Sequence, residues 1–307
     1  MEALFVPLSL LAGGLLAVQA GANTQLSKAT GSPFAATTIQ VVIAGGLLLI
    51  VAAATGTILA FASLPSVPWW HAIGGIATAI YVASTILLFP RLGAVVTVGL
   101  FIAGQMLASI GLDTFGVLGV PRQPPETATI VGTAAVFAGA AAIVAGQKGA
   151  TSDLSASKLG WILLALLAGA VLPIQGAING LLRSDIGAPF VVGTISFIVA
   201  TLAMVVVLLT TLVLTDAPKP QLDGLAKMPR WGWLGAVCGA TYVTTVFTAI
   251  PVIGTAATVG LTVAGQQIAS LFVDRYGWFR LPKREISGLR FSGVALLLIG
   301  VALIQVF

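Results

Sequence analysis

Charged residues are scarce in this sequence. Of its 307 residues only 14 are basic and 9 are acidic, so charged residues make up 7 % of the chain, whereas hydrophobic residues make up 58 %. The mean hydropathy is +1.09. A soluble domain carries about 25 % charged residues, because its surface must face water. The scarcity of charge therefore excludes a water-soluble protein and indicates a surface that faces lipid.

Histidine and cysteine are almost absent as well, since the chain has only His71 and Cys238. A single cysteine excludes an intramolecular disulfide. Without a carboxylate pair in an apolar stretch, nothing is left from which to build a catalytic triad, a zinc site or a carboxylate dyad. No phosphate loop of the form Gly-x-x-x-x-Gly-Lys-[Ser/Thr] is present. We therefore expect no enzymatic activity, no metal and no cofactor.

Long apolar runs fill most of the chain. A helix needs about 20 residues to cross the hydrocarbon core of a bilayer. Ten stretches qualify, at 4–26, 34–62, 68–89, 93–112, 127–147, 160–182, 188–214, 231–250, 254–273 and 286–306. Their continuous Leu, Ala, Val and Gly runs do not alternate as barrel strands do. The sequence thus predicts an all-α polytopic membrane protein with ten transmembrane helices, and tight turns at Pro90–Gly93 and Pro251–Gly254.

Basic residues fall mainly in alternate loops. If all ten stretches cross the membrane, the loops on the side of the termini hold only Arg122 and Arg183, whereas the loops on the other side hold twelve Lys and Arg residues. Positive charge gathers in cytoplasmic loops. We therefore expect both termini on the side away from the cytoplasm. The same rule explains the net charge of +5 without a nucleic-acid partner.

An internal repeat divides the chain. Motifs in the first 40 residues recur 156 residues later, and residues 81–116 match residues 242–277, 161 residues later, at 15 of 36 positions. The repeated polar residues are Gln19/Gln175, Asn23/Asn179, Tyr81/Tyr242, Gln105/Gln266, Ser109/Ser270 and Asp113/Asp274. Chance similarity between Ala- and Leu-rich stretches does not supply such rare residues in one register.

The repeat predicts two halves of opposite orientation, residues 1–150 and residues 151–307. Each half holds five predicted helices, an odd number, so the second half enters the membrane from the opposite side. Inverted repeats of this kind are a recurring plan of secondary transporters, because the two halves make inward- and outward-facing states equivalent. A channel can be built in the same way.

A family resemblance follows from these motifs. The Gln-x-x-x-Asn of the first span, the Gly-x-Pro-Phe after it and the AGQxxAS…D..G of the fourth span resemble the YdcZ-type bacterial inner-membrane family. This family belongs to the drug/metabolite transporter superfamily, and the chain is similar to its fused, antiparallel two-repeat form over nearly its whole length. The resemblance implies a multi-pass protein of the bacterial inner membrane. Better-known ten-helix members of the superfamily usually keep both termini in the cytoplasm, whereas the charge count here predicts periplasmic termini.

Polar side chains inside the spans mark the candidate site, because such groups are costly in lipid and face the bundle interior or a water-filled cavity. The spacing i, i+4 places Gln105 and Ser109 on one helix face. We expect a substrate cavity lined from both halves, with the first pair below as the strongest candidate. The predicted residues are Gln105/Gln266, Tyr81/Tyr242, Gln19/Gln175 and Ser109/Ser270. The alternative is that these groups form hydrogen bonds between packed helices.

Other polar residues have interpretations of their own. Asp113 and Asp274 lie at span ends, either as interfacial carboxylates that pair with an arginine or cap a helix, or as a gate or proton-binding group. Asn23 and Asn179 are interpreted as caps or packing residues. His71, beside two tryptophans, is interpreted as part of an aromatic belt at the membrane interface. Cys238 is interpreted as a small packing residue.

These features together predict a secondary transporter that moves a small metabolite or drug-like solute by alternating access. The alternatives are a passive channel and a non-transporting membrane scaffold or lipid-handling protein. The expected partners are a small-molecule substrate and membrane lipid. The expected assembly is a monomer or a homodimer.

Overall fold

The computed structural model describes residues 2–120, 122, 124–146, 156–215, 217–253 and 255–306. In this part of the chain the secondary structure is entirely helical, and ten α-helices have 18 residues or more. They are α1 (Glu2–Thr30), α2 (Pro33–Ala54), α3 (Gly75–Leu92), α4 (Ala94–Phe115), α5 (Thr127–Ala145), α6 (Ala156–Ile186), α7 (Pro189–Leu214), α9 (Leu234–Ile253), α10 (Thr255–Tyr276) and α11 (Gly288–Val306). The short helices are η1 (Thr57–Ser66), η2 (Trp69–Gly74), α8 (Asp223–Lys227), η3 (Arg230–Trp233) and η4 (Trp278–Arg280).

Each predicted span coincides with one long helix, and the largest difference lies in the second. That span was expected to reach residue 62, but α2 ends at Ala54. Gly56 follows with φ of 70°, a left-handed conformation that ends a helix and that glycine adopts without steric strain. Residues 57–66 form η1 instead.

The tight turn that was predicted after Pro90 is confirmed. Pro90 lies inside α3, and Gly93 alone, with φ of 85°, separates α3 from α4. The corresponding Gly254 lies outside the described residues.

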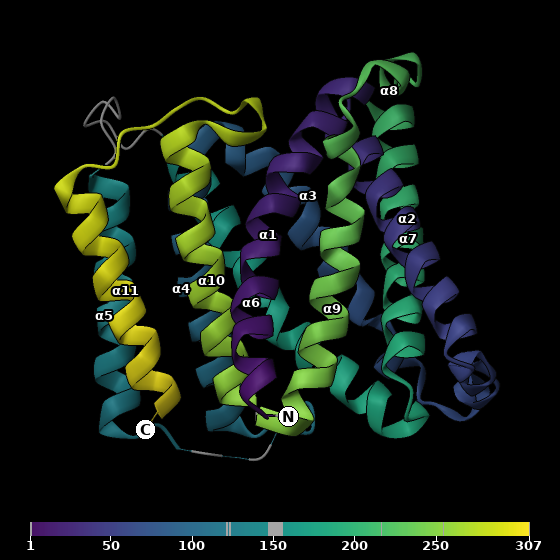
Figure 1. Ribbon diagram of the computed structural model, residues 1–307, viewed down its shortest axis with the longest axis horizontal. Coiled ribbons are helices and arrows are strands. Elements are labelled where there is room, and N and C mark those ends of the chain that lie inside the picture. Colours follow the sequence, from purple (N-terminus) through teal and green to yellow (C-terminus); the bar gives the residue numbers. More distant parts are fainter. Residues whose placement is uncertain are drawn as a thin grey trace.

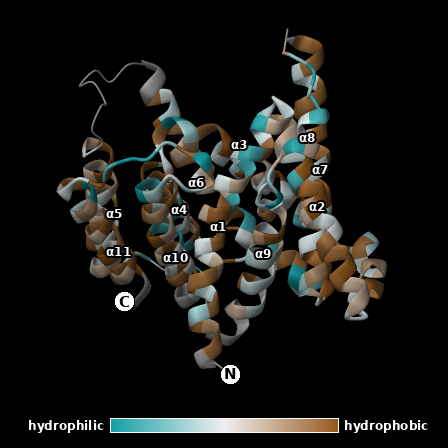
Figure 2. Cartoon of the chain, turned by 45° about the horizontal axis from the view of Figure 1, so that its top comes forward, coloured by the Kyte–Doolittle hydropathy of each residue, from teal (hydrophilic) through white to brown (hydrophobic). Residues whose placement is uncertain are grey.

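The long helices have the character of membrane helices. Among the described residues, seven segments are long and apolar enough to cross a membrane: α1, α2, η2 together with α3, α4, α5, α6 and α7. Leu202, Val206 and Val213 on the outer side of α7 are each more than 60 % exposed. Figure 2 shows hydrophobic residues running along α2 and α7, whereas hydrophilic residues gather near α8 and in loops. These outer faces suit contact with lipid tails.

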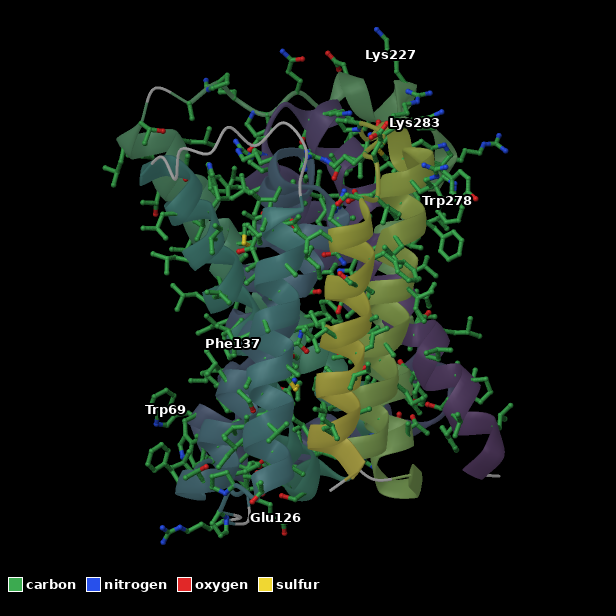
Figure 3. All side chains as sticks on the ribbon, turned by 90° about the vertical axis from the view of Figure 1, so that its left-hand side faces the viewer. Trp69, Glu126, Phe137, Lys227, Trp278 and Lys283 are labelled. Atoms are coloured by element: carbon green, nitrogen blue, oxygen red, sulfur yellow. The ribbon has the colours of Figure 1, made fainter. Side chains whose placement is uncertain are left out.

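The bundle has two distinct ends. Both chain termini lie at one end, which we call the terminal face, and α8 lies at the other, which we call the basic face (Figure 1). Figure 3 shows Lys227 and Lys283 at the basic face and Trp69 and Glu126 at the terminal face. Lys227 and Lys283 thus lie at the end opposite the termini, which is where the loop analysis places them.

The most extensive helix interfaces join the first half of the chain to the second: α5 with α11, α1 with α10, α4 with α6, α1 with α9, and α2 with α7. Gly13 of α1 abuts the carbonyl oxygen of Thr262 of α10, so a side chain there would collide with the backbone. The repeat equivalents, Gly169 of α6 and Phe101 of α4, make the same contact. Equivalent helices thus make equivalent crossings, and the two halves are related by a pseudo-twofold axis.

Candidate functional site

A cavity of about 80 Å³ lies between α1, α3, α6, α7 and α9. Ten of its fourteen lining residues form five repeat-equivalent pairs. The pairs are Leu16/Leu172, Gln19/Gln175, Thr78/Gly239, Tyr81/Tyr242 and Val82/Val243. Because equivalent residues line it from both halves, the cavity lies on the pseudo-twofold axis. Its volume is large enough to hold several water molecules.

The described lining of the cavity is uncharged, with a few polar groups set in a mainly apolar surface. It contains the amides of Gln19, Gln175 and Asn179 and the hydroxyls of tyrosine and threonine, and the remaining lining residues are apolar or glycine. An ion that enters such a cavity meets no counter-charge, and the transfer of an unpaired ion out of water is strongly unfavourable. The lining thus favours a neutral occupant.

On the side of the second half, the polar residues bond to one another. The Nε2 of Gln175 donates to the Thr78 hydroxyl at 2.5 Å and to the Ser196 hydroxyl at 3.4 Å. The Nδ2 of Asn179 donates to the same Ser196 oxygen at 3.3 Å. Asn179 lies well inside α6, so its interpretation as a helix-end cap is wrong. Its spacing of i, i+4 from Gln175 indicated that it shares the face of the cavity.

On the side of the first half, three amides are buried with fewer bonds. Gln19, Asn23 and Gln40, which we call the amide trio, are 4 %, 0 % and 1 % exposed. The Nε2 of Gln40 donates to the Gly235 carbonyl at 3.5 Å. Among the described residues, Oε1 of Gln19, Oε1 of Gln40 and both side-chain polar atoms of Asn23 have no hydrogen-bond partner. Each such atom costs about 1–3 kcal/mol if nothing else pairs with it.

Side chains of α4 and α10 hold the two tyrosines, Tyr81 and Tyr242, in place. Gln266 donates through Nε2 to the Tyr81 hydroxyl at 2.6 Å. The Tyr81 ring lies against Phe101, with ring centroids 5.0 Å apart. The equivalent of Phe101 is Thr262, which forms a hydrogen bond with Tyr242. The same place in the two halves is therefore filled by a ring contact in one and by a hydrogen bond in the other.

The predicted site residues separate into two groups. Tyr81, Tyr242, Gln19 and Gln175 line the cavity, whereas Gln105, Gln266, Ser109 and Ser270 are not among its lining residues. Gln266 lies behind Tyr81 and holds its hydroxyl. Gln105 is 7 % exposed, and its Nε2 has no partner in the described part of the chain. Ser109 is half-buried, and the Ser270 hydroxyl donates to the Gln267 carbonyl of its own helix. The geometry thus reverses the expected order of the two glutamine pairs.

Asp274 is bound on all sides. Its carboxylate forms an ion pair with Arg290 at 2.8 Å, and each of the two residues is 1 % exposed. It also accepts the backbone N–H groups of Ala94 at 2.8 Å and Val95 at 3.2 Å, so it caps the first turn of α4. Asp113 is half-buried near the end of α4, and the residue equivalent to Arg290 is Thr129. The geometry of Asp274 is therefore that of the cap and arginine partner, one of the two interpretations.

His71 has a specific partner that the sequence did not indicate. Its Nδ1 lies 2.5 Å from the carboxylate of Asp185 near the end of α6, and the imidazole is buried. Trp69, its neighbour, is exposed at the terminal face (Figure 3). Trp69 thus fits the predicted aromatic belt at the membrane interface, whereas His71 instead links η2 to α6 through Asp185. The equivalent positions at the basic face are Gly232 and Ala29, so this pair exists at one end only.

Comparisons with known proteins agree with this architecture. The family model described as "Putative inner membrane exporter, YdcZ" matches residues 4–142 and 160–303. The chain belongs to this family. The two matched ranges correspond to the two halves, and the family's description is that of a membrane transporter and not of an enzyme. This YdcZ-family chain is accordingly a multi-pass protein of the inner membrane.

A solved structure shares the fold. The chain described as "Crystal structure of protein" is 18 % identical, has a TM-score of 0.62, and the match covers 97 % of this chain and 96 % of that one. At this identity the likeness is one of fold alone. No curated protein matches the chain.

The arginine partner distinguishes the two aspartates experimentally. We expect Asp274→Asn to lower the free energy of unfolding by about 3–5 kcal/mol, because Arg290 is left as an unpaired buried charge. Asp113→Asn is the matched control, and we expect a change below about 1 kcal/mol, because Asp113 is only half-buried and Thr129 stands where Arg290 stands in the other half. Thermal unfolding of the purified proteins in detergent measures both. Equal stability of the two variants would contradict the assigned role of Asp274.

Proposed function

We propose that this YdcZ-family protein is a secondary transporter that exports a small solute by alternating access between two inverted five-helix repeats, with ten membrane crossings. The observation that carries the proposal is the cavity on the pseudo-twofold axis, lined by repeat-equivalent pairs from both halves. A solute bound on such an axis lies in an equivalent position relative to the two membrane faces. Exchange of the conformations of the two repeats then converts one facing state into the other.

The polar contacts at the basic face have no repeat equivalent among the described residues of the terminal face, so the two ends differ in what must be broken to open them. At the basic face η4 lies on α1: the Nε2 of Gln25 donates to the Phe279 carbonyl at 2.6 Å, and Lys28 donates to the Arg280 carbonyl at 3.4 Å. At the terminal face the equivalents of Gln25 and Lys28 are Leu181 and Ser184, which lack these long donors. These polar contacts fasten η4 to α1 at the basic face, whereas at the terminal face the contact of Gly119 with Leu181 is apolar.

The distribution of charge supports an orientation. Twelve of the fourteen basic residues belong to loops or helix ends of the basic face, if the chain crosses ten times. We place the basic face in the cytoplasm and both termini in the periplasm, because positive charge is retained on the cytoplasmic side. In this orientation the fastened end is cytoplasmic, and the solute leaves on the side of η1 and η2.

Thiol labelling tests the orientation. In a Cys238→Ala background, we expect Glu126→Cys to react with a membrane-impermeant maleimide added to the periplasmic side of intact cells. We expect Lys283→Cys to react only after the inner membrane is permeabilised. Labelling of Lys283→Cys but not Glu126→Cys in intact cells would reverse the assignment.

Solute flux tests the transport function. We expect Gln266→Leu to reduce saturable uptake of a labelled metabolite mixture into proteoliposomes about five- to tenfold, because the Tyr81 hydroxyl loses its hydrogen-bond donor. Gln267→Met is the matched control. Gln267 is fully buried next to Gln266, both of its polar atoms lack a partner among the described residues, and its repeat equivalent is Met106.

The control should preserve flux, and imposed pH and voltage gradients identify any coupling ion. Linear, unsaturable conductance would establish a channel in place of a transporter. Equal flux in Gln266→Leu and in the unchanged protein would remove Tyr81 from the pathway.

A further inference from the structure

The two halves differ at two equivalent positions, one in the lining of the cavity and one beside it. The second half contributes Ser196 where the first contributes Gln40, and α3 contributes Thr78 where α9 contributes Gly239. One side of the axis thus has two short hydroxyls, which bond to Gln175. The other side has one long amide opposite a residue with no side chain. The two substitutions compensate each other in size but not in hydrogen bonding.

The glycines of α9 create the space that the amide trio occupies. A Cβ atom on Gly239 would lie 3.1 Å from Nε2 of Gln40 and 3.3 Å from both Nε2 and Oε1 of Gln19. A Cβ atom on Gly235 would collide with the Asn23 amide. The three amides therefore converge on one bare stretch of the α9 backbone. Gln19 and Gly239 line the cavity, whereas Asn23 and Gln40 are buried behind this lining.

The trio offers donors and acceptors together. Each amide has one carbonyl oxygen and two N–H donors. In the described part of the chain, the carbonyl oxygens of all three and the Nδ2 of Asn23 have no hydrogen-bond partner. A matching ligand group must donate to carbonyl oxygens and accept from N–H groups at once. A carboxamide or a ureido group does both, whereas a carboxylate only accepts and an ammonium only donates.

The other lining residues indicate the polarity and charge of the rest of the ligand. Tyr81 and Tyr242 flank it, and Leu16, Leu172 and Val82 line it with apolar surface. No charged side chain belongs to its described lining. Among the described residues, the Asp274–Arg290 ion pair and the contact of His71 with Asp185 lie toward the two ends of the bundle. A charged headgroup would therefore be buried without compensation.

We propose that the amide trio is the headgroup subsite for the transported solute, which is a small uncharged molecule with a carboxamide or ureido group on an apolar or planar body. This assignment rests on the proposed transport function, because it names the solute that the cavity takes. On the Gln175 side of the cavity, the amide nitrogens of Gln175 and Asn179 donate to hydroxyls, and Oδ1 of Asn179 is the one buried side-chain atom there without a partner among the described residues. That side serves as the wall opposite the headgroup.

Three pyridines of the same shape test the subsite: nicotinamide, nicotinate and 3-(aminomethyl)pyridine, which at pH 7 carry a neutral, a negative and a positive substituent. Isothermal titration calorimetry with the full-length protein in detergent measures their affinities. We expect nicotinamide to bind at least about tenfold more tightly than either charged isostere. Equal or tighter binding of a charged isostere, binding that requires added sodium, or no binding of nicotinamide would overturn the proposal.

Variants of the trio locate the binding. We expect Gln19→Leu to weaken nicotinamide binding about tenfold, and Gln40→Ser, which introduces the residue of the other half, to weaken it by a similar factor. Gln267→Met, the buried amide outside the cavity, should leave the affinity unchanged. The melting temperature of each variant establishes that it is folded, and Gln40→Ser decides the question if Gln19→Leu does not fold. Unchanged affinity in a folded trio variant would exclude the subsite.

A flux assay on the same preparation separates the two levels of the proposal. Saturable flux of a metabolite mixture without any preference for neutral amides would overturn the headgroup subsite and leave the transport function standing. The absence of saturable flux for every component would overturn both.

Discussion

Lipid supplies no hydrogen-bond partner, so every amide, hydroxyl and carboxylate of the long helices must find its partner inside the bundle. Close crossings of α1 over α10 and of α6 over α4, where Gly13 and Gly169 let the backbones touch, keep these groups inside the bundle, and the atoms left without a partner among the described residues lie there too. These crossings gather the polar side chains around the pseudo-twofold axis. The cavity, the amide trio and the network around Gln175 are consequences of that arrangement.

Much of the fold followed from the sequence, because the period and length of apolar runs determine where a membrane helix begins and ends. The repeat also indicated that Tyr81/Tyr242 and Gln19/Gln175 share an axis. It could not rank the glutamine pairs, since an i, i+4 spacing shows which side chains share a helix face but not what that face contacts. Gln40 and Thr78 escaped notice because their equivalents, Ser196 and Gly239, differ, so neither position appears as a repeated motif.

The differences between the halves carry as much information as the likeness. Asp274 has an arginine partner that Asp113 lacks, His71 has a carboxylate partner at the terminal face only, and η4 is fastened to α1 by donors that α6 does not possess. A perfectly symmetric pair of repeats would have equal energies in its two facing states. These one-sided contacts bias the balance between the states, and only part of that bias involves titratable groups.

The central claim is that the two faces open alternately around one cavity. Spin labels at residues 28 and 283 report the basic face, and labels at their repeat equivalents, 184 and 122, report the terminal face. Double electron–electron resonance in nanodiscs, with and without a transported solute, measures both distances. Alternating access predicts that one distance increases while the other decreases. Distances that change together, or do not change, would contradict it.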